Sequence, residues 1–166
     1  DSVASRGLGD VYKRQILLDE PFSHIDSFKK RPLRRGIFNY LKSNAIACVL
    51  ATHDKDDVLS FADQMLVLQK GRVLSSGRPK HLYNQPGHPI IASFFAEHSS
   101  IDGVIYYAHQ IKLVDKGGVR AVVVKSYLKE GFYLIETTYK GQRVFLNHFD
   151  FIRSGTNVCL LFDNNA

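Results

Sequence analysis

The sequence predicts an α/β segment with parallel strands and covering helices, followed by a small all-β domain. Two short apolar runs, residues 16–19 and 45–52, lie on either side of a segment with helical periodicity. Strands that are apolar without alternation are typical of parallel sheets in which both faces are covered. After about residue 100, short β-rich runs are separated by glycine-containing turns, which is typical of a small barrel or sandwich.

The same patterns divide the chain into three parts. Residues 1–15 show neither helical nor strand periodicity and are expected to be a non-native or disordered leader. Residues 16–99 are predicted to form the α/β part, which ends with a hairpin turning at Lys70 and Gly71 and with two short helices. Residues 100–166 are predicted to form the β domain.

The helix between the two apolar runs is predicted to pack through Leu33, Ile37, Tyr40 and Leu41, which fall on one side of it. The basic residues between 29 and 35 are predicted to lie on a solvated face of this helix. They account for part of the net charge of +6. This local explanation of the charge gives no reason to expect a nucleic-acid partner.

The composition predicts a soluble cytosolic protein with a hydrophobic core, since 45% of the 166 residues are hydrophobic. No apolar stretch has membrane-spanning length, and the start lacks a signal-peptide pattern. Cys48 and Cys159 lie in apolar runs and are expected to be buried thiols in a reducing compartment. The seven histidines are scattered, so a metal site built from histidine or cysteine is not expected.

Acidic and histidine side chains follow the two predicted strands at the points where they end. Asp19 and Glu20 close the first strand, and His53 comes directly after the second. Chemistry in open α/β sheets collects beyond the carboxyl ends of the strands. A magnesium ion would offset the charge of Asp19, Glu20 would orient and deprotonate a water, and His53 would contact a phosphoryl group. This division of roles predicts phosphoryl transfer.

These motifs resemble the ATPase subunit of ABC transporters. The run ILLDEP (residues 16–21) looks like its Walker B segment, SHID (residues 23–26) looks like its D-loop, and His53 in ATHD looks like its switch histidine. The D-loop departs from the usual pattern at His24 and Ile25, where the family usually has alanine and leucine. The run from 62 to 95 resembles the end of the ATPase domain in importer subunits for polyamines, ferric ions, sulfate or sugars, and the β-rich tail resembles their TOBE domain.

The resemblance implies an ATP-hydrolysing, energy-coupling subunit of an importer that uses ATP and Mg²⁺. Asp19 would hold Mg²⁺, Glu20 and His53 would be catalytic, and Ser23 and Asp26 would act across a homodimer of ATPase subunits. The other implied partners are integral-membrane permease subunits and, indirectly, a solute-binding protein. The implied location is the cytoplasmic face of the bacterial inner membrane, where the subunit would be peripheral.

The chain departs from the family because it contains no Gly-x-x-x-x-Gly-Lys-Ser/Thr phosphate loop, no Q-loop and no Leu-Ser-Gly-Gly-Gln signature. We therefore expect a C-terminal fragment of a longer subunit that hydrolyses no ATP by itself. Two alternatives stay open. The β-rich tail also resembles OB-like barrels, which favours a binding module, and an ABC ATPase without a transporter would share the same motifs.

Overall fold

The computed structural model describes residues 15–163, which fall into two compact units, one ending at Phe61 and the other beginning at Ala62. The predicted leader lies outside the described residues except for Gln15, which already belongs to the first strand. The predicted boundary near residue 99 stays a prediction.

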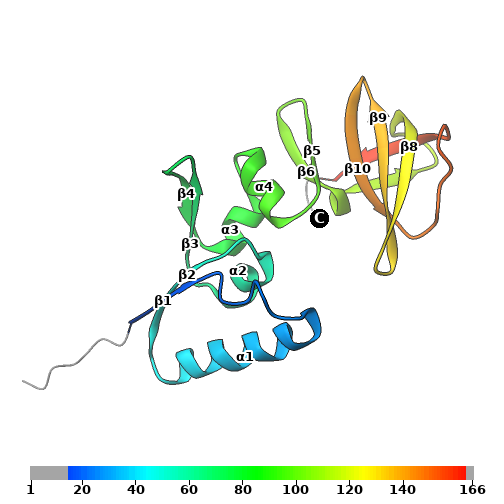
Figure 1. The fold of residues 1–166 in the computed structure, drawn as a ribbon. Helices are drawn as coiled ribbons and strands as arrows, with labels where there is room; N and C mark the ends of the chain where they lie inside the picture. The colour runs from blue at the N-terminus through cyan, green and yellow to red at the C-terminus, as the bar shows by residue number, and fades with distance from the viewer. Residues whose placement is uncertain (1–14, 164–166) are drawn as a thin grey trace, which may run out of the picture. The chain divides into compact units, whose positions relative to one another are not determined.

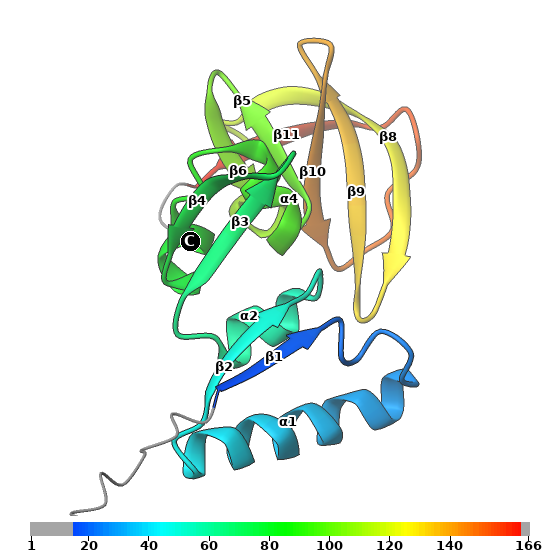
Figure 2. The same ribbon diagram turned by 60° about the vertical axis from the view of Figure 1, so that its left-hand side comes forward.

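The first unit is a strand–helix–strand–helix segment (Figures 1 and 2). Strand β1 (Gln15–Asp19) runs parallel to strand β2 (Ala47–Ala51), with Leu17 opposite Val49. Helix α1 (Ser27–Ser43) connects the two strands, and helix α2 (Lys55–Phe61) follows β2. Parallel strands joined by a helix confirm the predicted α/β organisation, and this connection brings the carboxyl ends of β1 and β2 to one edge.

The apolar sequence of the two strands predicted that both faces would be covered, but in the described residues one face is largely exposed. The side chains of Leu17 and Val49 are 74% and 54% exposed, whereas Ile16 and Leu50 on the opposite face are partly buried. The described part of the first unit contains two strands and two helices. Within the described residues of this unit, the face that carries Leu17 and Val49 is therefore largely open, unlike the two covered faces that the sequence predicted.

Helix α1 packs through a different set of residues from the one predicted. Leu41 is buried and Ile37 is half-buried, as expected, but Leu33 and Tyr40 are exposed. The position facing inward beside them is Arg34, only 4% exposed. The physical reason is that Arg34 pairs with the carboxylates of Asp54 and Asp57. These ion pairs allow a charged side chain to lie on the buried face of the helix.

The second unit begins with a hairpin of strands β3 (Met65–Gln69) and β4 (Arg72–Gly77). It turns at Lys70 and Gly71, as predicted, with φ angles of 48° and 75°. Positive φ at both central residues is the geometry that matches the twist of a two-residue hairpin. The two predicted short helices follow as α3 (Pro79–Asn84) and α4 (Pro89–Phe95).

A small apolar core joins these helices to the next hairpin. That hairpin consists of β5 (His98–Ile101) and β6 (Val104–Tyr107), and a short 3₁₀ turn, η1 (Ala108–Gln110), follows it. The core contains Leu82, Ile91, Ala92, Phe95 and Tyr107. Strand β5 was not predicted, because three of its four residues, those before Ile101, are histidine or serine and have little preference for strands.

The rest of the second unit is a five-stranded antiparallel sheet with the order β10-β9-β8-β11-β7. Its strands are β7 (Ile111–Val114), β8 (Val119–Lys129), β9 (Phe132–Tyr139), β10 (Gln142–His148) and β11 (Asn157–Phe162). The first and last strands of this order, β10 and β7, also contact each other, so the sheet curls around its core. That core is formed by Ile101, Ile111, Ala121, Val123, Ile135, Val144, Leu146 and Leu160. A β-rich C-terminal part, as the sequence predicted, is thus confirmed.

Two further observations bear on the sequence predictions. No helix within residues 15–163 is long and apolar enough to cross a lipid bilayer. Cys48 and Cys159 are free thiols that are half-buried rather than fully buried, and burial raises the pKa of Cys48 above its ordinary value.

Candidate functional site

The end of β1 places Glu20 in an unusual backbone conformation. The amide of Glu20 donates a hydrogen bond to the Ala51 carbonyl at 2.9 Å, which extends the β1–β2 ladder by one residue. Its φ of 44° lies in the left-handed region, which costs a residue with a side chain about 1–2 kcal/mol. Such conformations persist where surrounding contacts hold them, and they are frequent at functional sites.

Glu20 and His53 are in direct contact, although 33 positions separate them in the chain. The Oε1 atom of Glu20 accepts hydrogen bonds from the His53 backbone amide at 3.1 Å and lies 2.7 Å from the His53 Nδ1 atom. An ionised carboxylate can only accept, so Nδ1 carries the proton in this contact and Nε2 is left for another partner. The His53 side chain is 77% exposed, so a ligand can reach it.

A tight turn after Glu20 is anchored on the inside of the first unit. The hydroxyl and amide of Ser23 donate to the Glu20 carbonyl at 2.9 and 3.2 Å. Phe22 is only 2% exposed, and its ring lies 6.0 Å from that of Phe38, which in turn stacks on Phe61 at 4.5 Å. The buried aromatic ring therefore fixes the turn that carries Glu20 and Ser23.

The turn after His53 is held by basic residues of α1. Arg34 pairs with Asp54 at 2.6 Å and also with Asp57, while Lys30 pairs with Asp54 at 2.7 Å. Partial burial alone would raise the pKa of Asp54, but hydrogen bonds from Lys30, the Asp56 amide and Arg34 lower this pKa to about 2. Asp54 is thus ionised at neutral pH, as the ion pairs require.

Side-chain hydrogen bonds complete the turn that begins at Thr52. The Thr52 hydroxyl donates to Asp57 Oδ2 at 2.7 Å and accepts from the Asp54 amide at 3.0 Å. The Asp54 carboxylate accepts from the Asp56 amide at 2.9 Å, in the first turn of α2. This bond makes Asp54 the cap of α2, as its position before an amphipathic helix suggests.

The structure brings together some of the residues singled out by the sequence. Glu20, His53 and Ser23 share one set of contacts, whereas Asp19 is exposed at the end of β1 and Asp26 is exposed at the start of α1. The carbonyl of Asp26 accepts from the amides of Lys29 and Lys30, so its backbone takes part in starting the helix.

The sequence did not single out Arg34, because it lies in a basic run that we expected to be solvated. One signal was available: Arg34 precedes Ile37 and Leu41 by three and seven positions, which places it on the same helical face.

Asp19 offers a single carboxylate, which suits a cation that takes most of its ligands from water and from substrate phosphates. Within residues 15–163 no three histidine, cysteine or acidic side chains are grouped so that they could hold a metal ion. Mg²⁺ usually takes only one or two carboxylates and completes its shell with water and substrate phosphates. A single exposed carboxylate at a strand end fits that mode of binding. It would not by itself form a closed cage of protein ligands.

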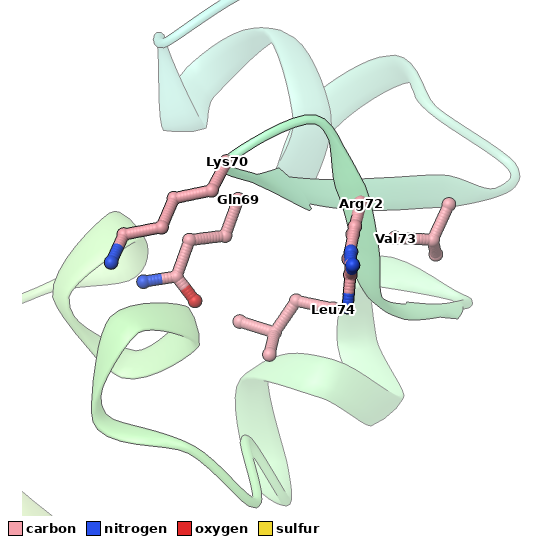
Figure 3. A pocket seen from close by; sticks show the side chains of 5 residues that line it. All are labelled: Gln69, Lys70, Arg72, Val73 and Leu74. Atoms are coloured by element: carbon pink, nitrogen blue, oxygen red, sulfur yellow. The ribbon is translucent and has the colours of Figure 1, made fainter.

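Two cavities of the second unit are lined by none of the candidate site residues. A cavity of about 530 Å³ lies at the β3–β4 hairpin, where Gln69, Lys70, Arg72, Val73 and Leu74 line it (Figure 3). A second cavity of about 720 Å³ is lined by residues of β7, β8, β10 and β11 and of their connections. Neither contains an acid–histidine pair in contact, so the candidate site is defined by the side-chain chemistry at Glu20 and His53.

Comparison with known proteins shows that the chain is similar to the ATP-binding subunits of ABC importers. Fe(3+) ions import ATP-binding protein FbpC 2 of Pectobacterium atrosepticum is 39% identical over 92 residues, which are 53% of this chain and 27% of that protein. Sulfate/thiosulfate import ATP-binding protein CysA of Anthoceros angustus is 44% identical over 71 residues, 43% of this chain and 19% of that protein.

A third relative covers more of the chain. Spermidine/putrescine import ATP-binding protein PotA of Bacillus thuringiensis is 30% identical over 115 residues, which are 69% of this chain and 35% of that protein. The chain therefore spans between 19% and 35% of the length of these three relatives. No protein-family model matches the chain.

Proposed function

We propose that the chain is the Walker B and switch-histidine part of an energy-coupling ATPase subunit of an ABC importer. The observation that carries this proposal is the contact of Glu20 with His53 at the carboxyl ends of two parallel strands. The similarity to import ATP-binding proteins supports it independently. In this role Glu20 is the general base that orients and deprotonates the attacking water, and His53 contacts the γ-phosphate.

The geometry of the pair suits this division of work. The Glu20 carboxylate uses Oε1 for both contacts with His53, which leaves Oε2 for a water molecule. With its proton on Nδ1, His53 presents Nε2, an atom that can bind a phosphate oxygen when protonated. Bound ATP and Mg²⁺ supply the transferable phosphoryl group and the neutralising charge. Asp19 would hold Mg²⁺, directly or through water, from the end of β1.

The partners in this proposal follow from the same resemblance. Ser23 and Asp26, exposed in the turn before α1, would communicate across a homodimer of ATPase subunits. Permease subunits would receive the energy, a solute-binding protein would deliver the cargo, and the subunit would sit peripherally at the cytoplasmic face of the inner membrane. The relatives are named for import of ferric ions, sulfate or thiosulfate, and spermidine or putrescine, and we propose a cargo of this kind or a sugar.

The second unit has no role in the chemistry under this proposal. Its five-stranded sheet, within the segment 100–166 that resembles a TOBE domain, would regulate or reinforce assembly. The 166-residue chain itself would hydrolyse no ATP, because its sequence holds no phosphate loop to orient the phosphates toward Glu20.

The test is Glu20→Gln in a longer subunit that carries these residues together with a phosphate loop. The amide keeps the shape of the carboxylate but cannot take a proton, so turnover should fall by about a hundredfold or more while ATP binding is retained. Glu130→Gln, at an exposed turn between β8 and β9, is the matched control and should leave turnover unchanged. Wild-type turnover in the Glu20→Gln subunit would remove Glu20 from the role of general base.

A further inference from the structure

We propose that Arg34 is a positioning residue for His53, a role that rests on the proposed function. Arg34 belongs to α1 and holds two carboxylates, Asp54 and Asp57, that follow His53 in the chain. Through them it fixes the turn that presents His53 to Glu20. Arg34 would act on the reaction only through these neighbours, so it is not itself a catalytic residue.

Burial makes the contacts of Arg34 specific. Its side chain is 5% exposed and that of Asp57 is 1% exposed, so each charge depends on the other for compensation. Three guanidinium nitrogens are engaged: Nη2 with Asp54 at 2.6 Å, Nε with Asp57, and Nη1 with Asp56 at 3.6 Å. The planar fork of arginine can hold carboxylates at separate nitrogens, whereas a lysine offers all its donors from a single nitrogen.

The contacts pass from Arg34 to both neighbours of His53. Asp54 follows His53 directly, and its carboxylate pairs with Arg34 and also with Lys30. Asp57 accepts the hydroxyl of Thr52, the residue directly before His53, and that hydroxyl in turn accepts the Asp54 amide. The backbone of His53 is therefore held from both sides, and its amide donates to Glu20.

Arg34 also contacts the turn that carries Glu20. Its guanidinium lies over the ring of Phe22, with 5.6 Å from the Cζ atom to the ring centroid. Phe22 is two residues after Glu20 and is almost fully buried. A cation over an aromatic face is attracted to it. One buried side chain thus contacts the segments that hold both members of the Glu20–His53 pair.

The direct test is amide hydrogen exchange of the 166-residue chain with Arg34→Lys. The His53 amide, which donates to Glu20, should exchange about tenfold faster or more, while the amides of the β1–β2 ladder stay within about twofold. Arg35→Lys, a neighbouring exposed arginine of the same helix, is the matched control and should change neither set. Equal acceleration of both sets, or no acceleration at His53, would overturn the positioning role.

If Arg34→Lys does not fold, a second variant tests whether Arg34 positions His53. Asp54→Asn keeps the buried Arg34–Asp57 pair and removes only the charge next to His53, so it should give the same selective acceleration at the His53 amide. An unchanged His53 amide in that variant would contradict the proposal.

Turnover separates this inference from the proposed function. In the longer subunit, Arg34→Lys should lower kcat about tenfold with the KM for ATP within about twofold, because the pair is misplaced while the nucleotide is still bound. If Glu20→Gln leaves turnover unchanged, the proposed function fails, but hydrogen exchange still decides whether Arg34 positions His53. If Glu20→Gln lowers turnover but Arg34→Lys changes neither kcat nor the exchange of the His53 amide, the positioning role fails and the proposed function stands.

Discussion

Glu20 combines an unfavourable backbone conformation with contacts that compensate for it. Its positive φ turns the chain sharply after β1, and its amide, carbonyl and carboxylate all have hydrogen-bond partners. The carboxylate partner is His53, which is brought to it by the parallel register of β1 and β2. At the scale of single residues, the site is thus a strained acid held beside an exposed imidazole.

Asp54 makes the stability of the first unit depend on acid pH. Its pKa is about 2 when folded, against an ordinary value of 3.8, so the unfolded chain takes up the proton first. The stabilisation is therefore fully present above about pH 4 and is lost as the pH falls through about 2. The shift corresponds to about 2 kcal/mol.

Denaturant unfolding of the wild type and Asp54→Asn across this range measures the effect. The stability difference between the two should be largest near pH 5 and should shrink toward pH 2. A difference that stays constant over this range would show that the charge of Asp54 does not stabilise the fold.

The elements of the first unit meet at an aromatic cluster. Phe22 from the turn after β1, Phe38 from α1 and Phe61 from α2 lie ring to ring. Replacing the buried Phe22 with alanine should lower the free energy of unfolding by about 3 kcal/mol. Phe28→Ala is the matched control, since that ring is 74% exposed and its loss should change stability by less than about 0.5 kcal/mol.

The same variants also test what the cluster does for the site. Because Phe22 anchors the turn that carries Glu20, Phe22→Ala should weaken protection of the Ser23 amide, which donates to the Glu20 carbonyl. Equal stabilities of Phe22→Ala and Phe28→Ala in denaturant unfolding would contradict the burial of Phe22 in a shared core.

Elements with a clear apolar pattern could be predicted, and those held by polar contacts could not. The parallel strands, the hairpin at Lys70 and Gly71 and the strands of the C-terminal sheet follow from apolar runs and turn residues. The packed face of α1 did not, because Arg34 is buried through partners 20 or more positions away. The sequence placed Glu20 and His53 at the same edge of the sheet. Their direct contact could not be predicted, because it depends on the turn after β2.

At the scale of the whole molecule, the two compact units differ in what holds them together. The first has a small aromatic cluster and a buried ion-pair network, and it contains every residue predicted to act in catalysis. The second has two apolar cores, one shared by α3, α4 and the β5–β6 hairpin and one inside the curled sheet. Helices before residue 99 and a strand after it share the first of these cores.

We propose that Glu20 and His53 work as one unit in ATP hydrolysis. The most direct measurement is a double-mutant cycle of kcat in the longer subunit, with Glu20→Gln, His53→Ala and both together, and with ATP binding measured for each. Groups that act together give strongly non-additive losses. We expect the double variant to be about as slow as Glu20→Gln alone. Losses that multiply, or near-normal turnover in His53→Ala, would contradict it.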